Sequence, residues 1–133
     1  MVNKSKKILA EISAGELLDK ISILEIKLDK IKNKNDHNKI DKEYKILLEA
    51  RDANIEISEK IKYLIKEIKQ VNLNLWDIED KLRICEKNKD FGQTFVELAR
   101  NVYFNNDKRA KIKSQINEIL GSDIREIKQY VDY

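Results

Sequence analysis

The sequence predicts an all-α protein, and three features of its 133 residues support this class. Proline is absent and glycine occurs only three times, so few residues interrupt a helix. Lys, Glu, Ile and Leu, which form or tolerate helices, are abundant. Apolar residues also recur at spacings of three and four, the period of one helix face. We therefore predict a single domain over 1–133: a long helical hairpin with coiled-coil packing, capped by two or three short C-terminal helices.

The first predicted helix covers 14–33 and follows a lead-in at 1–12, where weak alternation over 6–12 also fits a short strand. Ser13 and Glu16 form a capping box directly before an apolar run. That run has heptad spacing and comprises Leu17, Ile21, Leu24, Leu28 and Ile31. A second apolar face carries Ile23 and Ile26, which indicates that the helix lies between two partners.

The second predicted helix is long, covering 39–88 after a polar turn at 33–38. Its apolar seam runs from Ile57 to Cys85 with heptad spacing. A straight helix of this length would span roughly 75 Å at 1.5 Å per residue, which is about twice the size of a compact domain of this length. We therefore expect either a break near 51–54, where the seam shifts, or a projecting coiled-coil arm.

The remaining chain, 91–131, is predicted to form the short-helix cap. One helix is expected over 91–104 and another over 107–120, unless the two are a single bent helix. Gly121 then ends the last of these, and a short terminal helix reaches 131.

Charge and composition exclude several classes of function. With 27 basic and 24 acidic residues, the net charge of +3 is too small to favour nucleic-acid binding. The single cysteine, Cys85, cannot form an internal disulfide and fits a reducing compartment. No secretory signal and no membrane-length apolar run is apparent. We therefore expect a cytoplasmic protein with no membrane association and no cofactor. We also expect no metal site, because His37 has no partner at ligand spacing.

A polar and aromatic stripe borders the seam of the second helix, and it is the strongest candidate site. It contains Trp76, Glu79 and Arg83 at helical spacing. If the C-terminal helices fold back, basic residues from them would reach this stripe, and Asn106 or Asp107 would cap the helix that presents two of them. The candidate ligand-binding residues are Trp76, Glu79, Arg83, Arg100, Asn106, Asp107, Arg109 and Lys113.

Two interpretations of this cluster stay open. It forms either a partly buried ion-pair network that docks the helices, or a binding site for a carboxylate or phosphate. The nearby carboxylates favour the network, whereas an uncompensated arginine lining a cleft would favour the anion site. No catalytic residue is assigned.

We accordingly predict a non-enzymatic helical interaction protein, with a small-anion binder or small-molecule enzyme as the alternative. The second apolar face of the first helix and the long seam of the second favour a homodimer, and another protein partner is also compatible with them. The predicted interface residues are Ile23, Ile26, Ile61, Leu64 and Ile68.

Three segments together resemble a family of short bacterial proteins of unknown function: "GELLDKISILEIK" at 15–27, "NLNLWDIEDKLR" at 72–83 and "ELARNVYFNNDKRAKIKSQIN" at 97–117. The resemblance implies no activity, ligand or catalytic residue. The stretch "ELLDKISILEIKL" is also similar to the first helix of all-helical chorismate mutases, which are dimeric and bind a dicarboxylate through Arg and Lys. The first helix here carries only Lys, so this similarity implies a fold and no function.

Overall fold

The computed structural model describes residues 6–133 and confirms the all-α class. Its helices are α1 (Ala14–Lys30), α2 (Lys34–Asn54), α3 (Glu59–Lys87) and α4 (Gln93–Leu120). Residues 6–12 form a lead-in without regular structure, and not the short strand that their alternation allowed. The first part of the predicted lead-in, 1–5, lies outside the described residues.

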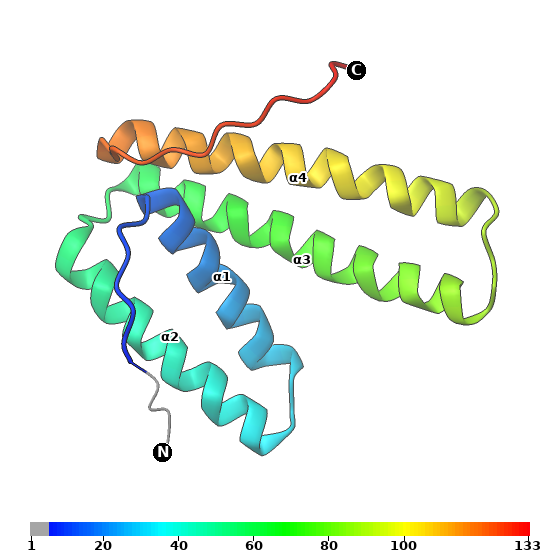
Figure 1. The fold of residues 1–133 in the computed structure, drawn as a ribbon, viewed down its shortest axis with the longest axis horizontal. Helices are drawn as coiled ribbons and strands as arrows, with labels where there is room; N and C mark the ends of the chain where they lie inside the picture. The colour runs from blue at the N-terminus through cyan, green and yellow to red at the C-terminus, as the bar shows by residue number, and fades with distance from the viewer. Residues whose placement is uncertain (1–5) are drawn as a thin grey trace.

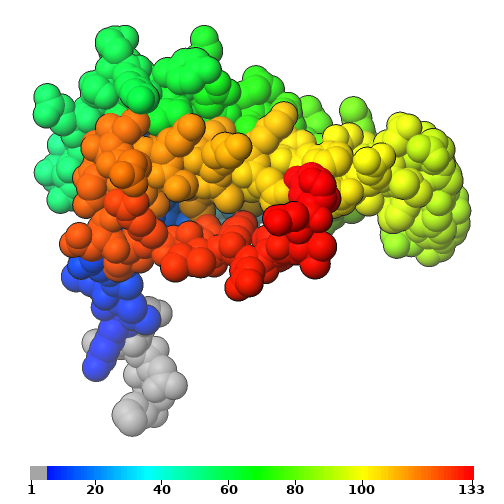
Figure 2. All heavy atoms as spheres, turned by 90° about the horizontal axis from the view of Figure 1, so that it is seen from above, coloured from blue at the N-terminus to red at the C-terminus, as the bar shows by residue number. Residues whose placement is uncertain are grey.

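The helices form two antiparallel hairpins that cross each other (Figure 1). The longer pair is α3 and α4, which lie side by side, and the shorter pair is α1 and α2. Among the helices, α1 contacts α2, α3 and α4, whereas α2 contacts only α1. The loop end of the α3–α4 pair extends beyond the other hairpin (Figures 1 and 2). Thus α1 is the helix that holds the two hairpins together.

The predicted second helix over 39–88 is in fact two helices, since α2 ends at Asn54 and α3 begins at Glu59. The break follows the predicted position at 51–54 directly, and Ser58 caps α3 by accepting a 3.2 Å hydrogen bond from the amide of Ile61. The predicted turn at 33–38 was wrong. Asn33 is the N-cap of α2, and its side chain accepts from the Asp36 amide at 3.1 Å. Asn and Asp favour both turns and caps, so composition alone did not separate the two.

The predicted helices over 91–104 and 107–120 are one continuous helix, α4. Asn106 and Asp107 lie within it and cap nothing, which corrects their predicted role. The "NND" stretch stays helical. Within it Asn105 is buried, and its amide nitrogen donates to the carbonyl of Asn101, one turn earlier, at 2.8 Å. The helix ends as predicted at Gly121, which has a positive φ of 64°.

The short terminal helix predicted up to 131 is absent. Residues 122–133 instead run back along α4 without regular structure (Figure 2). Ser122, a candidate cap for that helix, is engaged elsewhere: its hydroxyl accepts a 3.0 Å hydrogen bond from the backbone amide of Ala14, at the start of α1. The Ser122 hydroxyl is therefore engaged by α1 and does not cap a helix at the C-terminus.

The hydrophobic core lies where α1, α3 and α4 meet. It comprises Leu17, Leu18, Ile21, Ile61, Leu64 and Ile116. In contrast, α2 has no buried residue, although the predicted hairpin relied on it for coiled-coil packing. Four predicted interface residues, Ile26, Ile61, Leu64 and Ile68, are buried within the single chain. Their surfaces are already covered by the chain's own helices, so they are not available to a second copy.

The start of α1 approaches α4 so closely that only glycine fits there. A Cβ atom on Gly15 would lie 2.6 Å from the carbonyl oxygen of Lys113. The amide of Gly15 donates to the side-chain oxygen of Asn117 at 2.7 Å, while Ser13 accepts from the amide of Glu16 at 3.1 Å. This contact aligns α1 with the half of α4 that carries the basic candidate residues.

Within residues 6–133, no helix is both long enough and apolar enough to cross a membrane.

Candidate functional site

A buried asparagine joins three helices at the centre of the candidate site. The side-chain nitrogen of Asn72 on α3 donates to the Asp19 carboxylate and to the Ser22 hydroxyl, both on α1 and both at 2.8 Å. The Ser22 hydroxyl in turn donates to the backbone carbonyl of Asp19 at 2.7 Å. All three residues are buried. Because both amide hydrogens of Asn72 are used in this way, its oxygen is directed toward α4.

That oxygen accepts a hydrogen bond from Arg109 on α4. Nη1 of Arg109 donates to Asn72 Oδ1 at 3.0 Å, and Nη2 donates to Asn106 Oδ1 at 2.7 Å. Both partners are neutral amides, and no carboxylate of the described residues forms an ion pair with Arg109. A guanidinium has five N–H donors and stays protonated. The two amides therefore hold the group in place and leave its charge and several of its donors uncompensated.

The next turn of α4 shows the opposite arrangement. Lys113 is surrounded by acids: its Nζ lies 2.6 Å from Glu16, 3.3 Å from Glu126 and 3.7 Å from Asp19. Its side chain is only 12% exposed. Burial lowers the pKa of Lys113, but the hydrogen bond to Glu16 and the charges of Asp19 and Glu16 outweigh this effect and raise the pKa above its ordinary value. Lys113 thus belongs to a charge-matched cluster.

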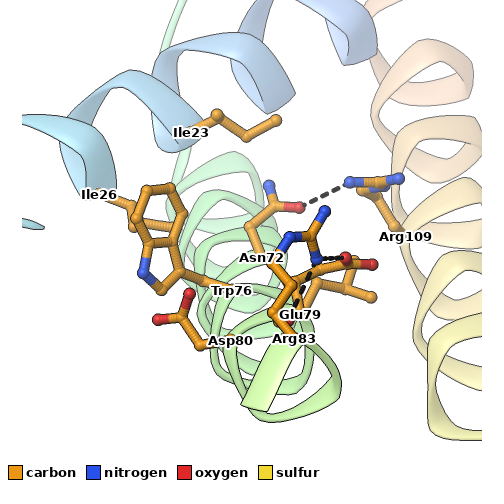
Figure 3. A pocket seen from close by; sticks show the side chains of 9 residues that line it. Ile23, Ile26, Asn72, Trp76, Glu79, Asp80, Arg83 and Arg109 are labelled. Atoms are coloured by element: carbon orange, nitrogen blue, oxygen red, sulfur yellow. Dashed lines mark hydrogen bonds and ion pairs between the residues drawn. The ribbon is translucent and has the colours of Figure 1, made fainter. Parts of the chain in front are cut away.

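A groove of about 320 Å³ opens beside Arg109 (Figure 3). In this view Trp76 lies next to Ile26 of α1, and Arg109 approaches from α4 on the opposite side. The lining residues are Ile23, Ile26, Asn72, Leu75, Trp76, Glu79, Asp80, Arg83 and Arg109. Three helices thus give the groove an apolar and aromatic wall, with two guanidinium groups and two carboxylates at its edge.

Arg83 and Glu79 form an ion pair on α3, one turn apart, as their spacing indicated. The pair is not the buried network that was one interpretation of the sequence, since the Arg83 side chain is 71% exposed and that of Glu79 46%. Exposed pairs of this kind are weak. Arg83 therefore stands at the rim of the groove, where its guanidinium is free to change partner.

The structure brings some of the predicted site residues together and separates others. Four of them line the groove: Trp76, Glu79, Arg83 and Arg109. Asn106 supports Arg109 from within α4, and Lys113 lines the adjoining hollow. The other two lie apart from the groove.

These two are Arg100 and Asp107. Arg100 stacks over the ring of Phe104, with its guanidinium carbon 5.6 Å from the ring centre. Asp107 accepts a hydrogen bond from the hydroxyl of Tyr133. Neither of these two side chains lines the groove.

Asn72, Asp19 and Ser22 were not among the predicted site residues. Asn72 precedes Trp76 by four residues, and this spacing places it on the same polar stripe of the helix without singling it out as a binding residue. Asp19 and Ser22 gave no such signal. Their roles depend on a contact with a residue 50 or more positions away.

The chain was compared with protein-family models, curated proteins and solved structures. The model of the family of unknown function DUF6165 matches residues 8–132. The chain belongs to this family. The match confirms the resemblance seen in three segments of the sequence, and it brings no activity or ligand with it. No curated protein matches the chain, and no solved structure matches it, so the similarity to helical chorismate mutases rests on the first-helix pattern alone.

Among residues 6–133, no group of three or more His, Cys, Asp or Glu side chains is arranged to hold a metal ion. Cys85 is buried in α3, as its position on the seam predicted. The groove itself offers a guanidinium fixed by two amides, an exposed guanidinium paired with Glu79, and an apolar wall. This combination is suited to an anion attached to an apolar body.

Proposed function

We propose that this member of the DUF6165 family binds a small organic anion in the groove between α1, α3 and α4. The anionic group, a carboxylate or phosphate, bonds to Arg109, and an apolar body, preferably a ring, packs against Trp76 and Ile23, which are both partly exposed in the groove. The observation that carries the proposal is the Arg109 guanidinium, which two neutral amides hold at the edge of an apolar groove without a carboxylate partner.

The geometry around Arg109 lowers the cost of binding. Its orientation is already fixed by Asn72, and Asn72 is fixed by Asp19 and Ser22, so little side-chain freedom is lost when a ligand arrives. Arg83 adds a second guanidinium at the rim, and exchanging Glu79 for the ligand would let it close on the anion.

The size and lining of the groove set the ligand class. A volume of about 320 Å³ lies at the lower end of the range for small-molecule sites, roughly 300–1,000 Å³. Apolar side chains make most of the wall, which disfavours inorganic phosphate and sugar phosphates because neither would use that surface. Glu79 is bonded to Arg83 and half-exposed, so the proposal is limited to binding and includes no chemical step.

The single tryptophan gives a direct test, because Trp76 lines the groove. Titration with phenylacetate and phenyl phosphate should change the Trp76 fluorescence saturably, whereas phenylacetamide and inorganic phosphate should not. The variant Arg109→Met should lose the response, and the matched variant Arg51→Met, whose arginine pairs with Asp52 at the end of α2, should retain it. Equal responses to the acid and its neutral amide would refute the proposal.

We propose self-association as a second function, because the loop end of the α3–α4 pair exposes apolar side chains. Ile84, Phe91 and Val96 lie there and are all largely exposed, and Phe91 packs edge-on against Phe95 at 5.3 Å. A surface of this kind is typical of protein contacts. It replaces the interface expected from the sequence, most of which is buried within the chain.

Sedimentation equilibrium at micromolar concentration tests this second function. A homodimer has about twice the chain mass of 15.7 kDa. Phe91→Ser should shift it toward the monomer, whereas Ile46→Ser, at an exposed apolar residue of α2, should not. A wild-type protein that sediments as a monomer would contradict the proposal.

A further inference from the structure

The C-terminal segment, residues 122–133, is attached to the body at separate points. Arg125 pairs with Glu118 at 2.7 Å, and Glu126 pairs with Lys113 at 3.3 Å. Near its end, the Tyr133 hydroxyl donates to Asp107. The Tyr133 ring also packs 5.5 Å and 5.4 Å from the rings of Tyr103 and Phe104. Figure 2 shows the segment as a narrow band along α4.

Between these points the segment buries little apolar surface. Ile127 and Val131 are each 91% exposed. The attachment therefore depends on ion pairs and one aromatic contact. Exposed ion pairs are individually weak and are screened by salt. A segment held in this way can detach without disturbing the hydrophobic core.

The segment also stands beside the proposed binding groove. A hollow of about 430 Å³ shares Ile23 and Arg109 with the groove, and the segment supplies Glu126 and Lys128 to its wall. The Glu126 carboxylate thus lies in the hollow that adjoins the groove on its Arg109 side. Burial raises the pKa of Glu126, but the hydrogen bond and charge of Lys113 outweigh it and lower the pKa below its ordinary value, which keeps the carboxylate ionised.

We infer that residues 122–133 form a releasable strap that opposes anion binding at Arg109, with the Glu126 carboxylate acting as a built-in competitor. The inference rests on the proposed function of the groove. With the strap closed, Glu126 lowers the positive potential near Arg109, and its backbone walls one side of the approach. An anion on Arg109 and a closed strap therefore disfavour each other, and this coupling must act equally in both directions.

The test uses the full chain and 8-anilinonaphthalene-1-sulfonate, an aromatic sulfonate, as the probe. Energy transfer from Trp76 to the probe reports binding close to the groove. Glu126→Gln should lower the dissociation constant by about fivefold, the lower end of usual coupling between sites. Glu86→Gln, which breaks the exposed pair with Lys89, is the matched control and should leave it unchanged.

Glu126→Gln changes the local charge as well as the attachment, so a second variant is needed. Tyr133→Ser removes the contacts with Asp107, Tyr103 and Phe104 but leaves the formal charge unaltered. A strap predicts tighter probe binding in both variants. A purely electrostatic effect of Glu126 would appear only in the first and would overturn the strap.

The reverse direction of the coupling is measured by limited trypsin digestion. Cleavage after Lys128 should accelerate when the probe is added to the wild-type protein, and also in both variants without the probe. Cleavage after Lys89, in the loop between α3 and α4, provides the internal reference. If the probe leaves the Lys128 rate unchanged relative to the Lys89 rate, the segment is not coupled to the groove and the inference is wrong.

The two proposals fail in different ways. Probe binding that requires Arg109 but is unaffected by Glu126→Gln and Tyr133→Ser would overturn the strap and leave the proposed function intact. Energy transfer that persists in Arg109→Met, in both the wild-type and the Glu126→Gln backgrounds, would overturn the anion site and with it the strap.

Discussion

The Arg109 guanidinium bonds to the side-chain oxygen of Asn72 at 3.0 Å, and this bond connects a surface groove to a buried polar cluster. On the other side of the amide, Asp19 and Ser22 fix the orientation of Asn72. A charged group at the surface is thus positioned from the interior of the protein.

Replacing Asn72 should be costly. The variant Asn72→Ala leaves the buried Asp19 carboxylate without its amide donor and Arg109 without one of its acceptors. A buried polar group that loses its partner costs about 1–3 kcal/mol, so we expect a loss of roughly 2–4 kcal/mol in the free energy of unfolding. Urea denaturation measures it. Asn74→Ala, at an exposed residue bonded only to Gln70, should cost under about 0.5 kcal/mol. Equal costs would mean that the Asn72 cluster contributes nothing.

The sequence predicted the helical class and one side of the groove, because both depend on local spacing. The apolar period defines the helices, and the four-residue steps of the stripe place Trp76, Glu79 and Arg83 on one face. The break after α2 was also among the sequence expectations, because the seam shifts there. Each of these features is decided by residues within one helix.

The other side of the groove was less predictable, because it depends on competition between distant groups. Ser122 could cap a helix of its own, but in the fold its hydroxyl accepts a hydrogen bond from the amide of Ala14. The "NND" stretch could end a helix or continue one, and it continues α4 with Asn105 buried. Where local signals allow two outcomes, packing against another element selects between them, and a single sequence does not show that packing.

Arg83→Ala should have a small effect on stability. One interpretation of the sequence was a buried pair, whose loss would cost several kcal/mol of unfolding free energy. The pair of Arg83 with Glu79, one turn apart on α3, is instead exposed. Such pairs contribute about 0.2–1 kcal/mol, so we expect a loss within this range. The same variant should weaken binding of phenyl phosphate, because it removes the second guanidinium. A loss above about 2 kcal/mol in urea denaturation would show that Arg83 has a structural role beyond this pair.

Gly15→Ala should destabilise the fold, because its new methyl group would meet the Lys113 carbonyl at 2.6 Å. Backbone atoms of two helices cannot yield easily, and overpacking of this kind costs about 1–3 kcal/mol. Gly92→Ala is the matched control, since its nearest contact is the Asp90 side chain at 3.4 Å. Thermal unfolding should show a clear decrease in Tm for the first variant and little change for the second. A tolerated Gly15→Ala would mean that α1 and α4 are farther apart than described.

The pair of Glu126 with Lys113 predicts a specific dependence on acid. Because the pKa of Glu126 is lower in the folded chain than its ordinary value of 4.5, the carboxylate contributes stability above that value. This contribution is lost as the pH falls through the folded pKa. Conversely, the pKa of Lys113 is raised above its ordinary value of 10.5 in the folded chain. The stability that protonated Lys113 contributes is therefore fully present below pH 10.5 and is lost as the pH rises through the folded pKa.

NMR titration of the Glu126 side chain measures the acidic half of this prediction. Its midpoint should lie below 4.5 in the wild-type protein. In Lys113→Met the midpoint should move upward, because the hydrogen bond and the charge that favour the carboxylate are gone while the partial burial remains. In the control variant Lys111→Met, which leaves the pair of Glu126 with Lys113 in place, the midpoint of Glu126 should stay at its wild-type value. An unchanged Glu126 midpoint would show that the pair does not persist in solution.

Asn105 is the one place where a more stable variant is expected. Its amide nitrogen donates to the Asn101 carbonyl, but its oxygen is buried and has no hydrogen-bond partner among the described residues. An unpaired buried acceptor costs about 1–3 kcal/mol, whereas an apolar side chain of similar volume carries no such cost. We therefore expect Asn105→Leu to raise the free energy of unfolding by roughly 1 kcal/mol, measured by urea denaturation. Asn101→Leu, at an exposed position one turn earlier, should leave it within about 0.5 kcal/mol. A loss of stability in Asn105→Leu would indicate that the oxygen is satisfied by a bound group and would direct attention to the hollow that Asn105 lines with Phe104 and Tyr133.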